Sequence, residues 1–128
     1  MFHRNAGSRP VYLNLAKIKL PVPGLMSIMH RISGVLMVLA IPFVIYLMER
    51  SLSSPEGFAQ ASAWLDLWWI QLAAVTLIWS LMHHVLAGLR YLLLDIHIGI
   101  ARPTAYRTAQ IVIAGGLVLT VLLAGALL

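Results

Sequence analysis

The chain has 128 residues, of which 61% are hydrophobic and only 10% are charged, and its formal net charge is +5. Since soluble domains average about 25% charged residues, so few charges cannot cover a water-facing surface, and a lipid bilayer must supply much of the solvent. The chain has no cysteine, which excludes disulfides, thiolate catalysis, iron–sulfur clusters and Cys-ligated zinc within it.

Residues 1–24 form a polar segment that carries Arg4, Arg9, Lys17 and Lys19. The segment has neither the apolar run and cleavage site of a signal peptide nor the length of a Ser- and Arg-rich transit peptide. We therefore expect a cytoplasmic or interfacial N-terminal segment, and we favour a bacterial cell inner membrane as the location.

Three apolar stretches follow, at about 25–48, 67–94 and 109–128. Each is long enough to cross ~30 Å of hydrocarbon as a helix of ~20 residues, and each is continuously apolar rather than alternating, which argues against membrane strands. The sequence therefore predicts an all-α fold, an integral membrane bundle of three transmembrane helices over residues 25–128. Pro42 lies inside the first stretch and is expected to kink that helix.

The connections between these stretches indicate how the bundle is oriented. The Ser-, Pro- and Gly-rich segment 51–57 is typical of a turn or loop, and Arg102-Pro103 is expected in the loop before the third helix. The first loop carries only Arg50 as a basic residue, beside two glutamates, whereas the second carries two arginines. Because Lys and Arg are enriched on the cytoplasmic side, we expect the N-terminus and the second loop to face the cytoplasm.

Polar side chains interrupt the first two apolar stretches. A charge near the centre of a membrane helix costs roughly 2.5–3.5 kcal/mol, so these residues need an explanation. In the first helix Arg31 shares a face with Ser27, four residues earlier, while His30 lies about 100° around the helix. The two sets are Ser27, His30, Arg31 and Ser33 in the first helix and His83, His84, Arg90 and Asp95 in the second.

The second helix carries His84, Gly88, Tyr91 and Asp95 along one stripe, because residues three and four apart share a helix face. Gly88 has no side chain, so a broad group can approach the backbone one turn from His84. His83 points in another direction, and we interpret it as a helix-contact residue.

An antiparallel pairing of the two helices places Arg31 level with about Gly88, roughly 6 Å to the cytoplasmic side of His84. This spacing suits a haem whose iron is held by His84 and whose propionates pair with Arg31. Two plainer interpretations stay open. An intramembrane His can make only an interhelical hydrogen bond, and Arg31 can simply extend to the interface.

The motifs around these residues resemble the cytochrome b subunit of succinate dehydrogenase, the larger membrane anchor of respiratory complex II. The run 27–34, Ser-Ile-Met-His-Arg-Ile-Ser-Gly, matches the family pattern Ser-x-x-His-Arg-x-Ser/Thr-Gly. The run 84–95, His-Val-Leu-Ala-Gly-Leu-Arg-Tyr-Leu-Leu-Leu-Asp, matches the pattern His-x-x-x-Gly-x-Arg-His-x-x-x-Asp except at Tyr91. A phenol can donate a hydrogen bond there but cannot carry an imidazolium charge. Arg9-Pro10 and the segment 51–58 also resemble this family.

The resemblance implies roles for four residues. It implies that His84 is an axial ligand of the iron of haem b, with the other axial His coming from a sister anchor. It implies that Ser27 and Arg31 line the ubiquinone site, and that His30 and Arg31 lie near the haem propionates. The implied partners are a second membrane-anchor subunit, an iron–sulfur subunit, a flavoprotein subunit and the lipid bilayer, with no nucleic acid.

The implied function is that of a non-flavin subunit, not catalytic alone, of an enzyme that passes electrons from succinate to ubiquinone in the respiratory chain and tricarboxylic acid cycle. One alternative is a fumarate reductase anchor, which runs this chemistry in reverse. An alternative of another class is a small non-redox membrane transporter or assembly subunit, which predicts no bound haem. A further possibility is a self-contained haem site in which His30 and His84 are both ligands.

Overall fold

The computed structural model describes residues 19–128, so Arg4, Arg9, Pro10 and Lys17 lie outside the described residues. Within residues 19–128 the chain forms helices and no strand. The helices in chain order are α1 (Val22–Ser53), α2 (Pro55–Leu65), α3 (Trp68–Asp95) and α4 (Arg102–Leu127). By length and composition α1, α3 and α4 can each cross a membrane. The prediction of an all-α fold with three transmembrane helices is confirmed.

Helix α1 is longer than the apolar stretch that predicts it. Pro21 is its N-cap and a second proline lies in its first turn, where proline is tolerated because the first amide groups have no helical partner. The helix continues through Pro42 to Ser53, and the kink expected at Pro42 stays a prediction. Its 32 residues span about 48 Å, more than the ~30 Å of hydrocarbon, so its ends reach the interfaces.

The segment 51–57 is mostly helical, so the expectation of a loop is wrong, whereas the expected turn is present at Ser54. Helix α1 ends at Ser53, and α2 begins after the single residue Ser54, whose hydroxyl accepts a 3.0 Å hydrogen bond from the Gly57 amide. A Ser N-cap, Pro55 in the first turn and Glu56 beside it are together a helix start signal. The absence of a side chain at Gly57 permits the tight turn, because a Cβ there would collide with the Arg50 carbonyl.

Helix α4 also begins earlier than its apolar stretch indicates. Arg102 is its first residue and Pro103 lies in its first turn, so the prediction that this pair lies in the preceding loop is wrong for the same physical reason as at α2. The loop itself is short, and it contains His97 and Gly99 with φ of 64° and 81°. A left-handed residue at a helix end is a common way to stop it.

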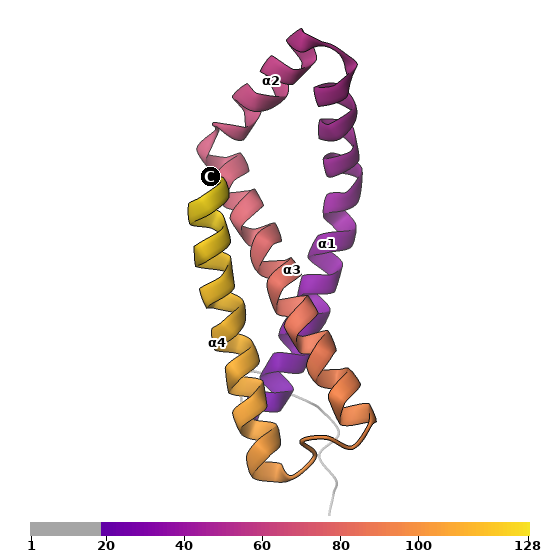
Figure 1. The fold of residues 1–128 in the computed structure, drawn as a ribbon, viewed down its shortest axis with the longest axis vertical. Helices are drawn as coiled ribbons and strands as arrows, with labels where there is room; N and C mark the ends of the chain where they lie inside the picture. The colour runs from indigo at the N-terminus through magenta and orange to yellow at the C-terminus, as the bar shows by residue number, and fades with distance from the viewer. Residues whose placement is uncertain (1–18) are drawn as a thin grey trace, which may run out of the picture.

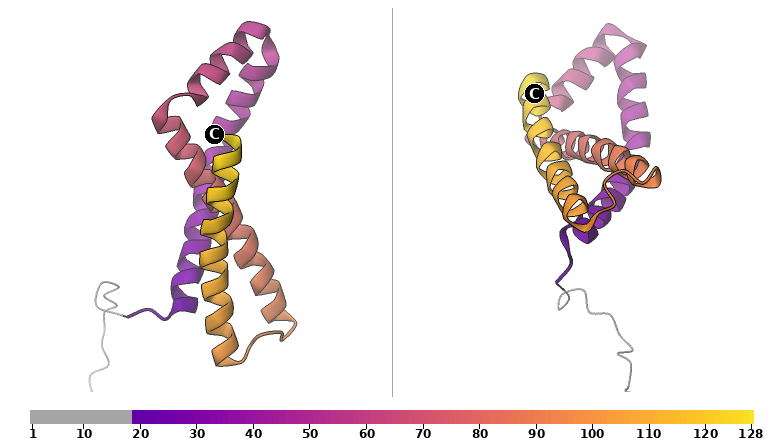
Figure 2. Two further views of the ribbon diagram at one scale, coloured as in Figure 1. Left: turned by 60° about the vertical axis from the view of Figure 1, so that its left-hand side comes forward. Right: turned by 60° about the horizontal axis from the view of Figure 1, so that its bottom comes forward.

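The three long helices share a buried cluster, and α1 separates from α3 toward the end where α2 joins them. Buried side chains join α1, α3 and α4 in a cluster of Met26, Ala87, Ala109 and Val112. Figure 1 shows α1 and α3 crossing and then separating toward the end where α2 joins them, and the left-hand view of Figure 2 shows α4 crossing in front of α3. The small residues in this cluster let the helix backbones approach, as in other membrane bundles.

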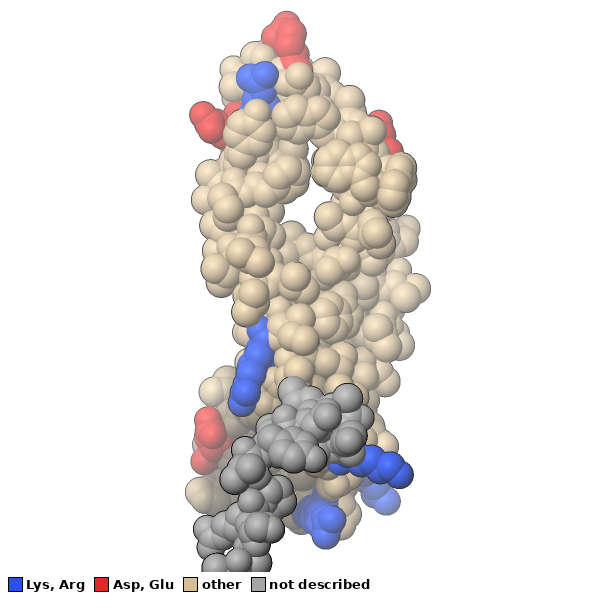
Figure 3. Space-filling view, turned by 180° about the vertical axis from the view of Figure 1, so that it is seen from behind, with Lys and Arg blue, Asp and Glu red and all other residues tan. Residues whose placement is uncertain are grey.

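The two ends of the bundle differ in charge. Lys19, Arg102 and Arg107 lie at the end that holds the start of α1 and the loop between α3 and α4, whereas Glu49 and Glu56 lie near α2. Figure 3 shows Lys and Arg gathered toward one end and Asp and Glu mostly at the other.

Candidate functional site

The two helices that carry the sequence motifs meet at His84. Its Nδ1 lies 3.1 Å from the Ser33 hydroxyl and 3.2 Å from the carbonyl oxygen of His30. The Ser33 hydroxyl in turn donates a 2.7 Å hydrogen bond to that same carbonyl. Ser33 is fully buried and His84 half-buried. One edge of the His84 ring is thus held by α1, and Nε2 makes no hydrogen bond with a described residue.

The His30 side chain lies between His84 and Tyr91. Its ring stacks on the His84 ring with centroids 4.0 Å apart, and it meets the Tyr91 ring edge-on at 5.3 Å. The pairing is antiparallel, because Gly34 contacts His84 while His30, earlier on α1, reaches Tyr91, later on α3. These contacts agree with the antiparallel alignment expected from the sequence, which places Arg31 level with about Gly88.

Two glycines shape the surroundings of His84. A Cβ added to Gly34 would lie only 3.2 Å from Cε1 of the His84 ring, whereas a Cβ added to Gly88 would meet no atom within 4 Å. The imidazole is therefore pressed against α1, while the surface of α3 one turn away stays open.

Arg31 and Ser27 lie on α1 but are not joined to this cluster. Arg31 is exposed and Ser27 half-buried. Arg31 borders a cavity of about 410 Å³ that is otherwise apolar, formed with Gly34 and the next two turns of α1. Among the described residues Arg31 has no hydrogen-bond partner, which is costly for a guanidinium in a membrane helix. The roles expected for both residues stay predictions.

His83 faces the inside of the bundle. It is fully buried, stacks on Trp79 at 5.5 Å, and packs against Gly116 of α4. Within residues 19–128 neither of its ring nitrogens has a hydrogen-bond partner. This placement agrees with its interpretation as a helix-contact residue.

Arg90 has a structural role that the sequence reasoning missed. It is 6% exposed; its Nε donates to the Thr108 hydroxyl and its Nη2 to the Ala105 carbonyl, both at 3.0 Å. Its guanidinium also lies 5.9 Å from the centre of the Tyr91 ring. Arg90 therefore ties the end of α3 to the start of α4.

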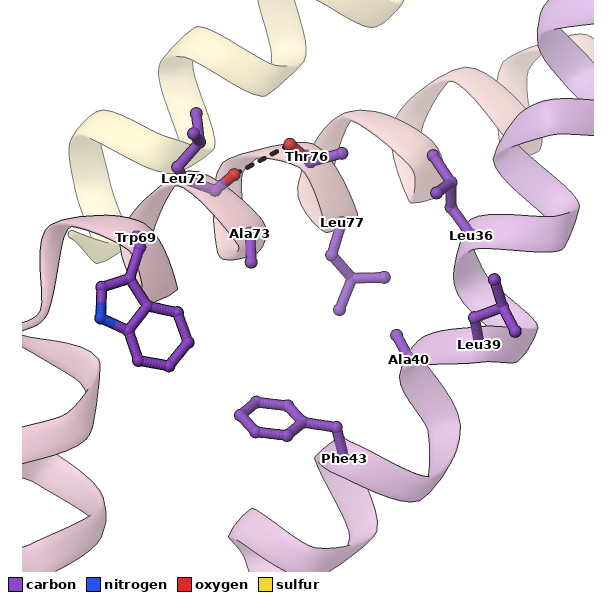
Figure 4. Close-up of a pocket in the computed structure, with 9 residues that line it drawn as sticks. All are labelled: Leu36, Leu39, Ala40, Phe43, Trp69, Leu72, Ala73, Thr76 and Leu77. Carbon is purple, nitrogen blue, oxygen red and sulfur yellow. Dashed lines mark hydrogen bonds between the residues drawn. The ribbon is translucent and has the colours of Figure 1, made fainter.

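Another cavity lies away from the His84 cluster. It occupies about 490 Å³ between α1 and α3, where Phe43, Trp69 and Leu77 point into it (Figure 4). Its hydroxyl, on Thr76, is already bonded to the Leu72 carbonyl at 2.8 Å. The lining is otherwise almost entirely aliphatic or aromatic, with the Trp69 indole N–H as its other polar group, so the cavity suits a mainly apolar occupant.

The His84 cluster fits one axial position of a haem. Residues 19–128 contain no group of three or more side chains that could hold a metal ion by themselves, but a haem iron needs only one ligand from each of two helices. A ligating His usually donates its second ring N–H to a carbonyl or hydroxyl, and the Nδ1 of His84 has both within reach.

Comparisons with known proteins point to one family of membrane subunits. Residues 5–123 match the family described as succinate dehydrogenase/fumarate reductase transmembrane subunit. The chain is similar to the succinate dehydrogenase cytochrome b556 subunit of Paracoccus denitrificans, with 36% identity over 92% of this chain and 91% of the relative. It is also similar to the subunit of the same name from Coxiella burnetii (strain RSA 493 / Nine Mile phase I), with 37% identity over 69% of this chain and 71% of the relative.

Proposed function

The chain belongs to the succinate dehydrogenase/fumarate reductase transmembrane subunit family, and from this premise we propose that it anchors succinate dehydrogenase in the membrane, holds haem b with a second anchor, and forms part of a ubiquinone site. Its three long apolar helices embed it in a membrane. The observation that carries the proposal is His84, whose Nδ1 is engaged by α1 beside an open surface at Gly88.

His84 holds the haem iron through Nε2 in this proposal, and His30 and Arg31 hold the propionates. When bound, the haem supplies a one-electron redox centre. The chain contributes a neutral imidazole for ligation and a fixed positive charge for the propionates. An unpartnered guanidinium on α1 supports this role, because an anionic partner offsets the cost of its position in the membrane.

A second anchor subunit supplies the other axial ligand. One ring nitrogen of His84 makes no hydrogen bond with a described residue, and much of α1 and α3 is exposed apolar surface, such as Val35, Leu39 and Leu81. Three helices cannot enclose a porphyrin alone. In this proposal the complex also includes an iron–sulfur subunit and a flavoprotein subunit, which would carry the electrons from succinate to the membrane.

Ser27 and Arg31 form this chain's part of the quinone pocket. A hydroxyl can hydrogen-bond a quinone carbonyl oxygen, and a guanidinium one turn away stabilises negative charge that develops on that oxygen. Neither group is a proton donor at neutral pH. Protons therefore reach the quinone through water or through a partner's side chain.

The N-terminus faces the cytoplasm of a bacterial cell in this proposal, and the protein lies in the inner membrane. Three basic side chains gather at the end of the bundle where α1 begins. Lys and Arg near helix ends stay on the cytoplasmic side, so the iron–sulfur subunit docks at that end.

Fumarate reduction is the second candidate, since the matched family covers both enzymes. Both relatives are named as succinate dehydrogenase subunits, which favours succinate oxidation. The quinone of the cell and the rates of both reactions decide the direction.

The test is a visible spectrum of the complex, purified in mild detergent through a tag on this chain. The proposal expects reduced-minus-oxidised haem b bands, co-purification of three further subunits, and loss of the bands in His84→Leu. A complex without haem, or one whose spectrum is unchanged by His84→Leu, contradicts the proposal and favours the non-redox alternative.

A further inference from the structure

Three polar atoms of α1 and α3 lie within hydrogen-bonding distance of one another. They are the Ser33 hydroxyl oxygen, the His30 carbonyl oxygen and the His84 Nδ1, separated by 2.7, 3.1 and 3.2 Å. Ser33 has no exposed surface, so water does not compete for its hydroxyl.

The chemistry of these atoms fixes where the protons lie. A carbonyl oxygen only accepts, and a hydroxyl has one proton, which Ser33 gives to the His30 carbonyl at the shortest of the three distances. An unprotonated Nδ1 would then face two lone pairs at close range. A protonated Nδ1 instead donates to both oxygens and satisfies all three contacts. His84 is therefore held with its proton on Nδ1 and its lone pair on Nε2.

We infer that Ser33 is a positioning residue, which selects this tautomer of His84 and fixes the rotation of its ring. The inference rests on the proposed function, because the selected lone pair on Nε2 is the one that a haem iron requires. Gly34 leaves room for the His84 ring, because a Cβ at this position would lie only 3.2 Å from Cε1 of that ring. One helical turn of α1 thus supplies the acceptors and the space that the His84 ring needs.

A hydrogen bond from Nδ1–H makes an imidazole a stronger electron donor to its metal. Loss of the Ser33 acceptor leaves the His30 carbonyl as the remaining partner of Nδ1. We therefore expect Ser33→Ala to lower haem affinity by ~10–100-fold and to raise the haem midpoint potential, because a weaker donor stabilises the oxidised iron less.

The experiment compares Ser33→Ala with Ser33→Thr in the purified complex. Thr keeps the hydroxyl and should retain the potential and the haem content of the parent. Ser80→Ala is the matched control, because Ser80 is an equally buried serine whose hydroxyl bonds the Thr76 carbonyl within its own helix. The readouts are the haem-to-protein ratio, the midpoint potential and the electron paramagnetic resonance of the oxidised haem.

The inference is supported when Ser33→Ala shifts these values and the other two variants do not. It is overturned when Ser33→Ala matches the parent, or when Ser33→Thr shifts as far as Ser33→Ala. If Ser33→Ala does not assemble, Ser33→Cys is measured in its place, since a thiol has a similar size but is a weak acceptor. A parent complex without haem would instead refute the proposed function.

Discussion

The imidazole rings of His30 and His84 are stacked, with centroids 4.0 Å apart and planes 17° apart. Two axial ligands of one haem each direct a ring nitrogen at the iron from opposite sides, whereas stacked rings turn their faces to each other. In this arrangement the two residues cannot ligate the same iron. The finding argues against the alternative of a self-contained haem site in which both histidines are ligands.

Replacing His30 should therefore leave the iron ligated. We expect His30→Gln to keep the low-spin haem b spectrum while weakening the hold on the propionates, so that haem is lost more readily in detergent. His84→Leu in the same background should abolish the bands. Loss of the low-spin spectrum in His30→Gln alone would restore the alternative in which both histidines are ligands.

The open surface at Gly88 yields a second prediction. Since a Cβ at Gly88 meets nothing within 4 Å in the chain, Gly88→Ala should not destabilise the helix bundle. If a haem lies against this surface, the added methyl should lower the haem content several-fold. Gly125→Ala is the control, because its Cβ also enters open space, far along α4 from His84. Equal haem content in both variants would place the haem elsewhere.

Membrane helices and the antiparallel register could be predicted from the sequence because they depend on apolar length and residue spacing. Helical geometry predicts that His84 and Gly88 share one face of α3. Combined with an antiparallel pairing, it also predicts which part of α3 lies beside His30. The helix boundaries could not be read from apolar content, because α2 is too short to form a long apolar stretch and the first turns of α4 are polar. At both places a proline in the first turn had to be weighed as a start signal rather than as a break.

The contacts within the cluster could not be predicted for a different reason. The bond between Ser33 and His84 depends on the rotation of two helices about their axes, which spacing along one helix does not determine. The same holds for Arg90, which the sequence places at a helix end but the structure places against α4.

His83 should be replaceable. Its two unpartnered buried nitrogens cost about 1–3 kcal/mol, whereas its stack on Trp79 contributes about 0.5–1.5 kcal/mol. We therefore expect His83→Leu to raise the stability of the purified complex by about 1 kcal/mol, seen as a higher Tm, with haem content unchanged. A clear loss of haem or of stability would mean that His83 has a partner beyond this chain.

Arg31 should matter for the quinone and not for succinate oxidation. We expect Arg31→Ala to lower succinate–ubiquinone activity by about 10-fold or more, because it removes the charge that stabilises the reduced quinone. Succinate oxidation with an artificial dye acceptor should stay near the parent rate. Arg31→Lys keeps the positive charge but loses the planar guanidinium group with its several N–H donors. Its succinate–ubiquinone activity should therefore lie between that of the parent and that of Arg31→Ala. Equal loss in both assays would indicate failed assembly instead.

Arg90 should stabilise the join between α3 and α4. Its two hydrogen bonds go to a neutral hydroxyl and a neutral carbonyl, so Arg90→Met leaves no buried charge behind. Hydrogen bonds from a charged donor contribute about 1.5–3 kcal/mol each, while the methionine side chain recovers part of the packing. We therefore expect a net loss of about 2 kcal/mol, seen as a lower Tm and faster proteolysis in the loop 96–101.

The matched control for this prediction is Arg107→Met, because Arg107 lies near the same loop and is exposed. It removes the same charge from the same end of the protein without breaking the contacts to Thr108 and Ala105. A Tm close to that of the parent is expected for this variant. If Arg90→Met and Arg107→Met lower the Tm equally, the positive charge near the loop 96–101 stabilises the protein, and the hydrogen bonds of Arg90 do not.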